Sequence, residues 1–458
     1  MGLGAALGAL LVCLVVAAPS EAAESYAAGS HLPAGGPALS SQGVGWAQYR
    51  RDGGYALRLA RGAAVTTLRT RPNRKRRWFF RLQLAGSDQG LLSKELFIKR
   101  RDGSLDRSPN EVYGSFLTRS GGQVERLGAR CQNGSRPPST DGDGAMAVTD
   151  STCPGQAPGQ AAVLRLAPAG ATTVRSFAGG LNTRIAGPYV AYDARGKDIV
   201  VLDWTTGVER YRLPIPGPFP ENSFDLDVQA DGKVAFAYDT GPRMAVAWAS
   251  PSEPFAHPVD LPARSSYAIK LVGDRIAFAR TSVVSFGILG EVGDALGEAG
   301  VSDLRGPGRV VARRVLTEAL DFDGRRLALV EAGCRGPRIA VRGSDEPPAA
   351  PRSCPLLLAR PIRQDRRGRL AVAVSCRGLT RGCGVARLRI AARRGKRLVT
   401  LASARYRSNP TTVRLRLRRG ASALLARRRG RVVVSARLVD DELAHTELRR
   451  TRTRVRLR

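Results

Sequence analysis

A short motif recurs along this sequence and constrains its fold more than any other feature. In each copy a turn containing Gly or Asp precedes an aliphatic residue, an alanine, and then an aromatic or aliphatic residue, as in Val234-Ala235-Phe236. The copies begin at Met146, Val190, Val234, Ile276 and Leu327, in steps of 44, 44, 42 and 51 residues. Repeats of about 40 to 50 residues with strand character are typical of β-propeller blades, so the period predicts this all-β architecture.

Other strands are expected around each motif. A second apolar run follows most copies, as at 199–202 and 244–248, and three to four strands per repeat are the anatomy of a blade. Trp46-Ala47 begins another repeat, and a less regular one is expected before Met146, with strands near 80–84, 95–99 and 113–118. This count predicts six or seven blades. Because an open ring exposes unpaired strand edges, we expect residues 38–46 to add a strand to the last blade.

One segment resembles a known class of repeat. Residues 199–213 contain Leu202-Asp203-Trp204-Thr205-Thr206-Gly207, in which a strand ending in Asp leads into a Thr-Gly turn. This pattern resembles the third and fourth strands of WD40-like and quinoprotein-type repeats. No Gly-His dipeptide accompanies these turns, so the resemblance is to the propeller class and not to the WD40 family proper. At the level of architecture the resemblance extends over residues 40–346. In this region the chain resembles secreted bacterial propeller proteins.

The N-terminal segment predicts export. An uncharged apolar run occupies residues 3–18, and small residues follow it, with Ser20 and Ala22 suited to the positions before a signal-peptidase cut. We therefore expect residues 1–22 to be a signal peptide, although no Lys or Arg precedes the run. Residues 23–38, rich in Ala, Gly, Ser and Pro, are expected to be a flexible lead-in to a propeller at 39–343. The expected location is secreted, extracellular or at the cell surface.

The cysteines outside the signal peptide predict disulfides. An even number in an exported chain favours disulfide bonds over free thiols. Fifteen pairings are formally possible, and proximity in the sequence favours Cys131 with Cys153, Cys334 with Cys354, and Cys376 with Cys383. Metal binding is the rival interpretation, but no CxxC occurs and the three histidines are far apart.

The composition changes after a Pro-rich linker at 344–354. Residues 355–458 contain 30 Lys and Arg against five Asp and Glu, a surplus of 25 in a chain whose net charge is +34. Apolar and basic residues alternate there, as half-buried strands require. Strands are expected near 355–361, 369–376, 384–391, 397–406, 411–418, 431–439 and 446–457, which resembles an immunoglobulin-like antiparallel β-sandwich in size and strand number.

Two arginine rows in this tail are candidate anion-binding residues. Alternation predicts that each row lies on one face of its strand; the candidates are Arg414, Arg416 and Arg418 in one row and Arg452, Arg454 and Arg456 in the other. An anionic cell-surface polymer or a membrane surface is the expected partner. Nucleic acid is disfavoured, because Tyr406 is the only aromatic residue in the tail available for base stacking. The competing explanation is a GC-rich genome, since 66 of the 73 basic residues of the chain are Arg.

The sequence contains none of the common catalytic motifs. It has no G-x-S-x-G elbow and no sialidase Asp-box, and its three histidines form no recognisable triad or metal cluster. Asp141-Gly142-Asp143 and Asp321-Phe322-Asp323 resemble pieces of calcium loops but lack the downstream acidic ligand, and turns explain both. Core packing explains the aromatic residues in the repeats. No catalytic residue, metal ligand or cofactor is therefore predicted.

These observations predict an exported binding or scaffolding protein without catalytic activity. The propeller would bind a protein or glycan ligand, and the arginine-rich sandwich would attach the protein to a surface. The alternative is a propeller-based hydrolase or lyase acting on cell-wall or extracellular polysaccharide, because propellers also host enzymes. Carboxylates or histidines that converge at the central channel would favour the alternative.

Overall fold

The computed structural model describes most of the chain after residue 23. The described residues are 24–27, 35–50, 52–73, 78–87, 90–101, 104–105, 112–118, 124–127, 139–141, 144–151, 160–167, 170–177, 182–194, 197–217, 223–241, 243–261, 266–281, 296–334, 336–348, 355–365, 367–375, 384–406, 411–440 and 445–456. The expected signal peptide lies outside them.

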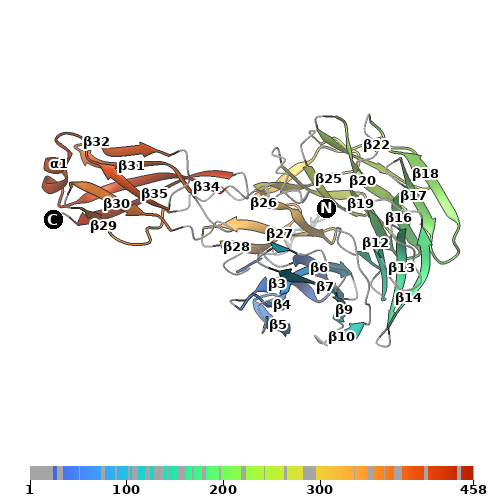
Figure 1. Cartoon of the computed structure of the whole chain (residues 1–458). Coiled ribbons are helices and arrows are strands. Elements are labelled where there is room, and N and C mark those ends of the chain that lie inside the picture. The colour runs from blue at the N-terminus through green and yellow to red at the C-terminus, as the bar shows by residue number, and fades with distance from the viewer. Residues whose placement is uncertain are drawn as a thin grey trace, which may run out of the picture.

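Five sheets follow one another in chain order, each with a path of four antiparallel strands (Figure 1). The first sheet contains β2 (Gly35–Ser40), β3 (Gly43–Tyr49), β4 (Tyr55–Arg61) and β5 (Ala64–Arg71). The second contains β6 (Trp78–Ser87), β7 (Gly90–Arg101), β9 (Val112–Thr118) and β10 (Val124–Leu127), with the short β8 (Ser104–Leu105) on β7. The third contains β11 (Ser139–Thr140), β12 (Ala145–Ser151), β13 (Gln160–Ala167) and β14 (Gly170–Phe177). The fourth contains β15 (Thr183–Ala186), β16 (Tyr189–Ala194), β17 (Asp198–Asp203) and β18 (Glu209–Pro214). The fifth contains β19 (Ser223–Val228), β20 (Val234–Asp239), β21 (Met244–Ala249) and β22 (His257–Pro258).

A sixth, seven-stranded sheet completes the propeller. Its strands are β23 (Ser266–Val272), β24 (Arg275–Thr281), β25 (Leu296–Asp303), β26 (Arg309–Phe322), β27 (Arg326–Gly333), β28 (Gly336–Gly343) and β1 (Glu24–Ala27). The first half of β26 pairs with β25 and the second half with β27, across a shift in register. The propeller thus has six blades if this sheet is one blade, and seven if two blades share β26.

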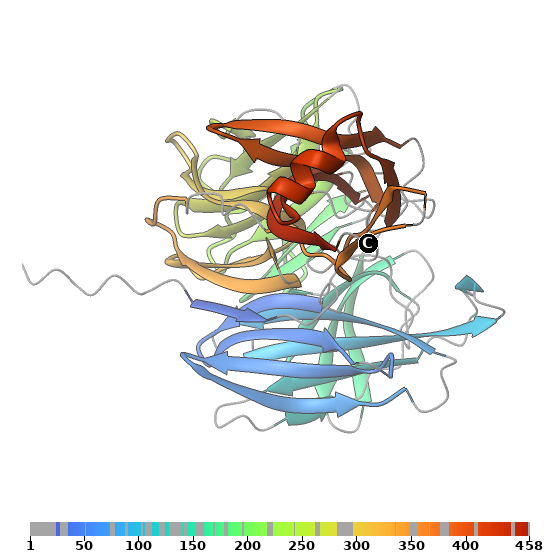
Figure 2. The ribbon, with the colours of Figure 1, turned by 90° about the vertical axis from the view of Figure 1, so that its left-hand side faces the viewer.

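The inner strands of the sheets form a ring. Each of β2, β6, β11, β15, β19 and β23 packs beside the next, and β26 packs beside both β23 and β2. Figure 2 shows the sheets of this ring from the side on which the C-terminal sheet lies. The predicted all-β propeller is confirmed.

The recurring motif occupies equivalent strands in four of its five copies. Four copies lie in β12, β16, β20 and β24, each the second strand from the inner edge of its sheet, so the predicted equivalence is confirmed for these four. The fifth lies in β27, in the same sheet as β24, where it pairs with the second half of β26. In the β20 copy, the large and the small side chains face different neighbouring blades. Ala235 and Ala237 share one core with Ile276 and Phe278 of the next motif, whereas Val234 and Phe236 share another with Ala191 of the preceding one. The alternation lets large side chains of one blade fill the space above alanines of its neighbour.

The strand that completes the last sheet differs from the prediction. Residues 38–46 belong to β2 and β3 of the first sheet, whereas β1, inside the segment expected to be a flexible lead-in, pairs with β28 from Glu24 with Val341 to Ala27 with Arg338. The physical reason is Tyr26, which is 8% exposed and stacks on Trp46 with 5.6 Å between ring centroids. One buried aromatic side chain anchors a short strand that composition alone does not reveal.

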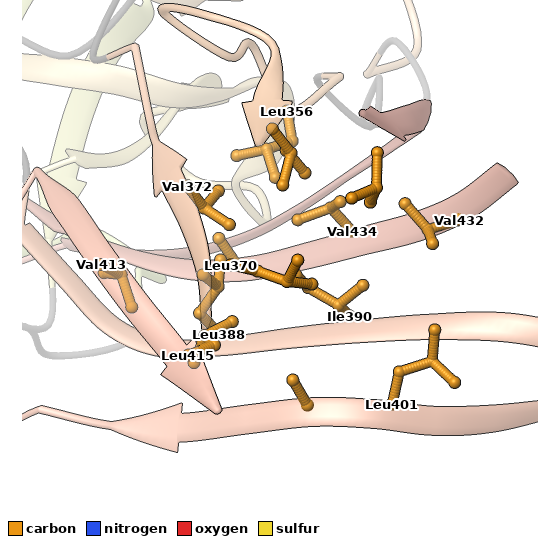
Figure 3. Packing of buried hydrophobic residues seen from close by; sticks show 14 of the residues in the cluster. Leu356, Leu370, Val372, Leu388, Ile390, Leu401, Val413, Leu415, Val432 and Val434 are labelled. Carbon is orange, nitrogen blue, oxygen red and sulfur yellow. The ribbon is translucent and has the colours of Figure 1, made fainter. Parts of the chain in front are cut away.

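The C-terminal region forms a separate curled sheet beside the propeller sheets (Figure 1). Its strands are β29 (Ile362–Gln364), β30 (Arg369–Ala373), β31 (Gly384–Arg394), β32 (Arg397–Arg405), β33 (Thr412–Arg416), β34 (Arg431–Asp440) and β35 (His445–Arg456), with one helix, α1 (Ala421–Arg427). One layer is β32-β31-β34-β35 and the other is β29-β30-β33. Both layers contribute to one apolar core (Figure 3).

The strands predicted for the C-terminal region are found in part. Six of the seven predicted strands have a counterpart, but the strand predicted at 355–361 does not: the first regular strand, β29, begins at Ile362. The sheet is not wholly antiparallel, because β29 pairs with β35 in parallel, Ile362 beside Val455. This pair is what joins the two layers into one continuous sheet. The resemblance to an immunoglobulin-like fold stays a prediction.

The WD40-like turn in the fourth sheet predicts a pH-dependent contribution to stability. Asp203 is 6% exposed, and its Oδ1 accepts hydrogen bonds from the Thr205 hydroxyl at 2.6 Å and from the backbone N–H groups of Thr205 and Thr206 at 3.0 and 3.1 Å. The Thr205 hydroxyl in the first place, and the backbone N–H groups with it, lower the pKa of Asp203, while burial opposes them. Because the folded pKa lies below that of the unfolded chain, the ionised carboxylate stabilises the fold above about pH 4.

We therefore expect Asp203→Ala to lower the free energy of unfolding of the propeller by about 1 to 3 kcal/mol at pH 7. The difference from the wild type should begin to shrink as the pH falls below about 4, because the unfolded chain then takes up a proton that the folded carboxylate resists. Urea unfolding at pH 7, 5 and 3.5 measures it, followed by tryptophan fluorescence, since all four Trp precede residue 344. A difference that stays constant across this range would contradict the assignment.

Candidate functional site

Side chains from one blade cap the backbone of the next around the centre of the propeller. The Asp225 carboxylate accepts a hydrogen bond from the Ile269 N–H at 2.8 Å, and the Asp227 carboxylate accepts one from the Leu271 N–H at 2.7 Å. The other such bonds run from the Gly273 N–H to Gln229 Oε1 (3.0 Å), from the Ile185 N–H to Ser139 Oγ (3.1 Å) and from the Leu39 N–H to Asp321 Oδ2 (2.6 Å). Inner strands are sheet edges, so these acceptors satisfy N–H groups that have no strand partner there.

The same ring gathers a cluster of charged side chains at the centre. Arg184 donates to Asp225 at 3.1 Å, and the Lys270 ammonium donates to Asp227 at 3.1 Å. Burial acts to lower the pKa of Lys270, but Asp227 and Asp321 outweigh it, so that the pKa of Lys270 is raised. Burial raises the pKa of Asp321, against the opposing effects of Lys270 and of two backbone N–H groups. The ammonium and both carboxylates are thus electrostatically coupled.

Carboxylates that converge at the centre of the propeller would favour the enzyme alternative. Three carboxylates do converge, those of Asp225, Asp227 and Asp321. Each accepts one or more backbone N–H groups, and Asp225 and Asp227 are also ion-paired. A general acid or base must exchange a proton with a substrate, whereas these oxygens already hold the blades together. The geometry therefore assigns the cluster to the cohesion of the ring.

The two possible calcium-loop fragments act as turns in the described part of the chain. Asp141 Oδ1 accepts the Ala145 N–H at 2.9 Å. Asp323 Oδ1 accepts the N–H groups of Arg325 and Arg326, and its Oδ2 pairs with Arg326 at 2.8 Å. Asp143 lies outside the described residues. Within the described residues no group of three or more His, Cys, Asp or Glu side chains could hold a metal ion.

The cysteine pairings stay predictions. Cys334 is disulfide-bonded. Cys131, Cys153, Cys354, Cys376 and Cys383 lie outside the described residues, so its partner does too.

The predicted arginine rows are exposed as the alternation requires. In β33, Arg414 and Arg416 are exposed while Val413 and Leu415 are 1% exposed in the core. Arg418 is exposed just beyond the end of β33. In β35, the row of Arg452, Arg454 and Arg456 is exposed. The sequence pattern therefore assigned the outward face of both strands correctly.

The strand register places the ends of the two arginine rows on one line across the sheet. Arg456 lies beside Arg363 in the parallel pair, Arg363 beside Ala371, and Ala371 beside Arg414. Directly paired residues share a face and neighbouring strands lie about 4.8 Å apart, so all four belong to the outer face of the curled sheet. The rows lie on different layers, but this line of residues connects them.

More arginines extend this surface beyond the predicted rows. On the β32-β31-β34-β35 layer, Arg405 pairs with Arg387 and Arg387 with Arg437, so three arginines lie abreast. We define the arginine face as the exposed, outward residues of the curled sheet: Arg363, Arg387, Arg389, Arg405, Arg414, Arg416, Arg431, Arg437, Arg450, Arg452, Arg454 and Arg456. Sequence reasoning missed most of them because pairing partners follow from register, although the alternation in 385–390 was a visible signal.

Acidic side chains do not neutralise this face within the described residues. The ion pair found in the described C-terminal sheet is Arg369 with Asp365 at 2.9 Å. Arg369 lies beside Arg416 on the same side of the sheet, but it is only half-exposed and its own charge takes up the carboxylate. Arg389 donates to the Thr400 hydroxyl, which leaves its charge uncompensated. In the propeller, by contrast, many arginines pair with acids, for example Arg342 with Glu331 and Arg280 with Glu298. The arginine face is the best candidate site in the described chain.

Comparisons with known proteins give no family. No family model and no curated protein matches the sequence. Among solved structures, the chain is similar to BamB from Moraxella catarrhalis (12% identity over 68% of this chain and 85% of that chain, TM-score 0.33). It is also similar to the WD40 domain of Toxoplasma gondii coronin (10%, 70% and 85%, TM-score 0.36) and to the computationally designed Ika8 protein (11%, 76% and 95%, TM-score 0.41). In the part of the chain that the structure describes, no helix has the length and apolar character needed to cross a bilayer.

Proposed function

We propose that this is an exported, non-catalytic binding protein, in which the propeller presents a surface to a protein or glycan ligand and the C-terminal sheet attaches to anionic material. The arginine face is the observation that carries the proposal. Its twelve exposed guanidinium groups have no acidic partner among the described residues. The apolar residues of the same strands are buried in the core, so the fold presents these charges outward instead of dispersing them.

Position on the sheet, more than arginine count, supports a binding role. A GC-rich genome fills exposed sites with Arg throughout a chain, yet the propeller arginines commonly have acidic partners and those of this face do not. Arginines near an anionic surface contribute on the order of 1 kcal/mol each, so a few engaged side chains suffice for attachment at low salt.

The expected result is that Arg450→Gln/Arg452→Gln/Arg454→Gln weakens retention on an anionic matrix. We expect the chain without residues 1–22 to bind vesicles of phosphatidylglycerol and phosphatidylcholine, or immobilised heparin, at about 50 mM salt and to elute as salt shortens the Debye length. The variant should elute at clearly lower salt. Elution from a salt gradient and vesicle co-sedimentation measure this.

The matched control removes the same charge from the propeller. Arg243, Arg313 and Arg325 are exposed and lie outside the arginine face, so their change to Gln tests net charge alone. If this control shifts elution as much as the sheet variant does, or if the wild type fails to bind at low salt, the proposed attachment function is wrong.

A further inference from the structure

The arginine face continues around the edge of the curled sheet from one layer to the other. Along β35, Arg450, Arg452, Arg454 and Arg456 are each two residues apart, so their Cα atoms are spaced by about 6.8 Å. At the end of this column the line turns across the strands through Arg363 to Arg414. Positive charges therefore form a track with no interruption longer than the single residue Ala371.

The layers that carry this track lie on opposite sides of one core. Leu370 and Leu415 come from the β29-β30-β33 layer, and Leu388 and Val434 from the other; all four are at most 1% exposed in the same cluster (Figure 3). The outer faces of two layers that enclose a common core point away from each other. A flat surface can touch the arginines of one layer or those of the edge, but not both outer faces together.

We propose that the partner of the arginine face is a flexible linear polyanion that follows this track around the sheet and contacts both layers. This inference rests on the proposed attachment function and names its partner. A flexible chain bends around the edge at β35 and β29, so it reaches guanidinium groups that a planar bilayer leaves unpaired. The planar fork of arginine matches phosphate and carboxylate groups bidentately, which suits a chain of repeated anionic groups.

The composition of the face determines which property of the polymer is recognised. Between the arginines the outward positions are occupied by small or aliphatic residues, such as Ser403, Ser435, Val433 and Ala371. The described strand residues of this face include no aromatic side chain on which bases or sugar rings could stack. The track therefore recognises the charge of the polymer and its ability to bend.

Two variants that remove three charges each, one from each layer, test the inference. The first is Arg450→Gln/Arg452→Gln/Arg454→Gln, and the second is Arg363→Gln/Arg414→Gln/Arg416→Gln. The probes are long-chain inorganic polyphosphate, poly-glutamate, and vesicles of phosphatidylglycerol and phosphatidylcholine. Binding to the chain without residues 1–22 is measured as a function of salt, with Arg243→Gln/Arg313→Gln/Arg325→Gln as the control. Thermal unfolding of each variant checks that the fold is kept.

For polyphosphate we expect both sheet variants to lose about 10- to 100-fold in affinity and to lower the slope of log K against log[salt] by about 2, since each engaged charge contributes about 0.7. The control should change little. Poly-glutamate shows whether carboxylate replaces phosphate. For vesicles, only one sheet variant should matter.

The outcomes separate this inference from the function on which it rests. If polyphosphate binding depends on one layer only, or if vesicles bind more tightly than either polymer, the wrapped polymer is wrong and attachment to a flat anionic surface stands. If neither polymer nor vesicle binds at low salt, the attachment function fails as well.

Discussion

Asp227→Ala is expected to lower the free energy of unfolding of the propeller by about 3 to 5 kcal/mol. The Asp227 carboxylate is nearly fully buried and joins two blades through the Leu271 N–H at 2.7 Å and the Lys270 ammonium at 3.1 Å. Its removal leaves a backbone N–H and an ammonium group without their partner at the centre of the ring. The Leu271 N–H then lacks an acceptor in a buried position, and the half-exposed Lys270 ammonium loses its counter-ion.

Urea unfolding followed by tryptophan fluorescence measures the effect on the propeller alone, because the tail has no Trp. Asp260→Asn is the matched control: this acid is exposed in the same part of the chain and should change stability by less than about 0.5 kcal/mol. Combining Asp227→Ala with Lys270→Met should recover part of the loss, since the second change removes the orphaned charge. Equal stability of Asp227→Ala and Asp260→Asn would show that the contact between the blades contributes nothing.

Trp46→Ala is expected to cost about 3 to 5 kcal/mol and to release the first strand. Trp46 is 1% exposed, stacks on Tyr26 of β1, and shares its core with Ile339 and Val341 of β28. The substitution leaves a large cavity where the first sheet meets the last. It also removes the aromatic partner of Tyr26, so we expect β1 to detach and the edge of β28 to become exposed to other chains.

The loss of stability and the detachment of β1 are measured separately. The three remaining tryptophans report the urea midpoint, and hydrogen exchange reports protection of the β28 amides. Val65→Ala, at a 44% exposed position of β5 in the same sheet as Trp46, is the control and should leave both unchanged within about 0.5 kcal/mol. Faster exchange confined to other strands, with β28 still protected, would contradict the role given to the stack.

The repeat predicted the architecture because its physical cause is local. Each copy needs a turn, then alternating large and small residues that fit the next blade, and this requirement leaves a mark every 44 residues. The contacts between the inner strands left no such mark. Asp321 lies in a stretch that looks like a turn, and Asp225 and Asp227 alternate with apolar residues as in any half-buried strand. The N–H groups that their carboxylates accept are set by three-dimensional arrangement.

The arginine rows, too, could be predicted only in part. Period-two alternation placed Arg414 and Arg416 outward, but the order of strands, which decides whether two rows meet, depends on the parallel pair of β29 and β35. Arg449 shows the limit of residue type as a guide: it occupies an inward position of β35 and is 0% exposed. Alternation assigns a face correctly even where the residue type argues for the other one.

The pairing of β1 with β28 also bears on how the chain acquires its structure during synthesis. Glu24 lies beside Val341, so β1 leaves the ribosome long before its partner β28 has been made. Contacts between such distant segments form slowly, because the intervening chain must be ordered first. The sheets between them can form one after another as they emerge, but the ring closes only after residue 343. The C-terminal sheet begins about 20 residues later, so its strands are still being synthesised when the propeller first has the chance to close.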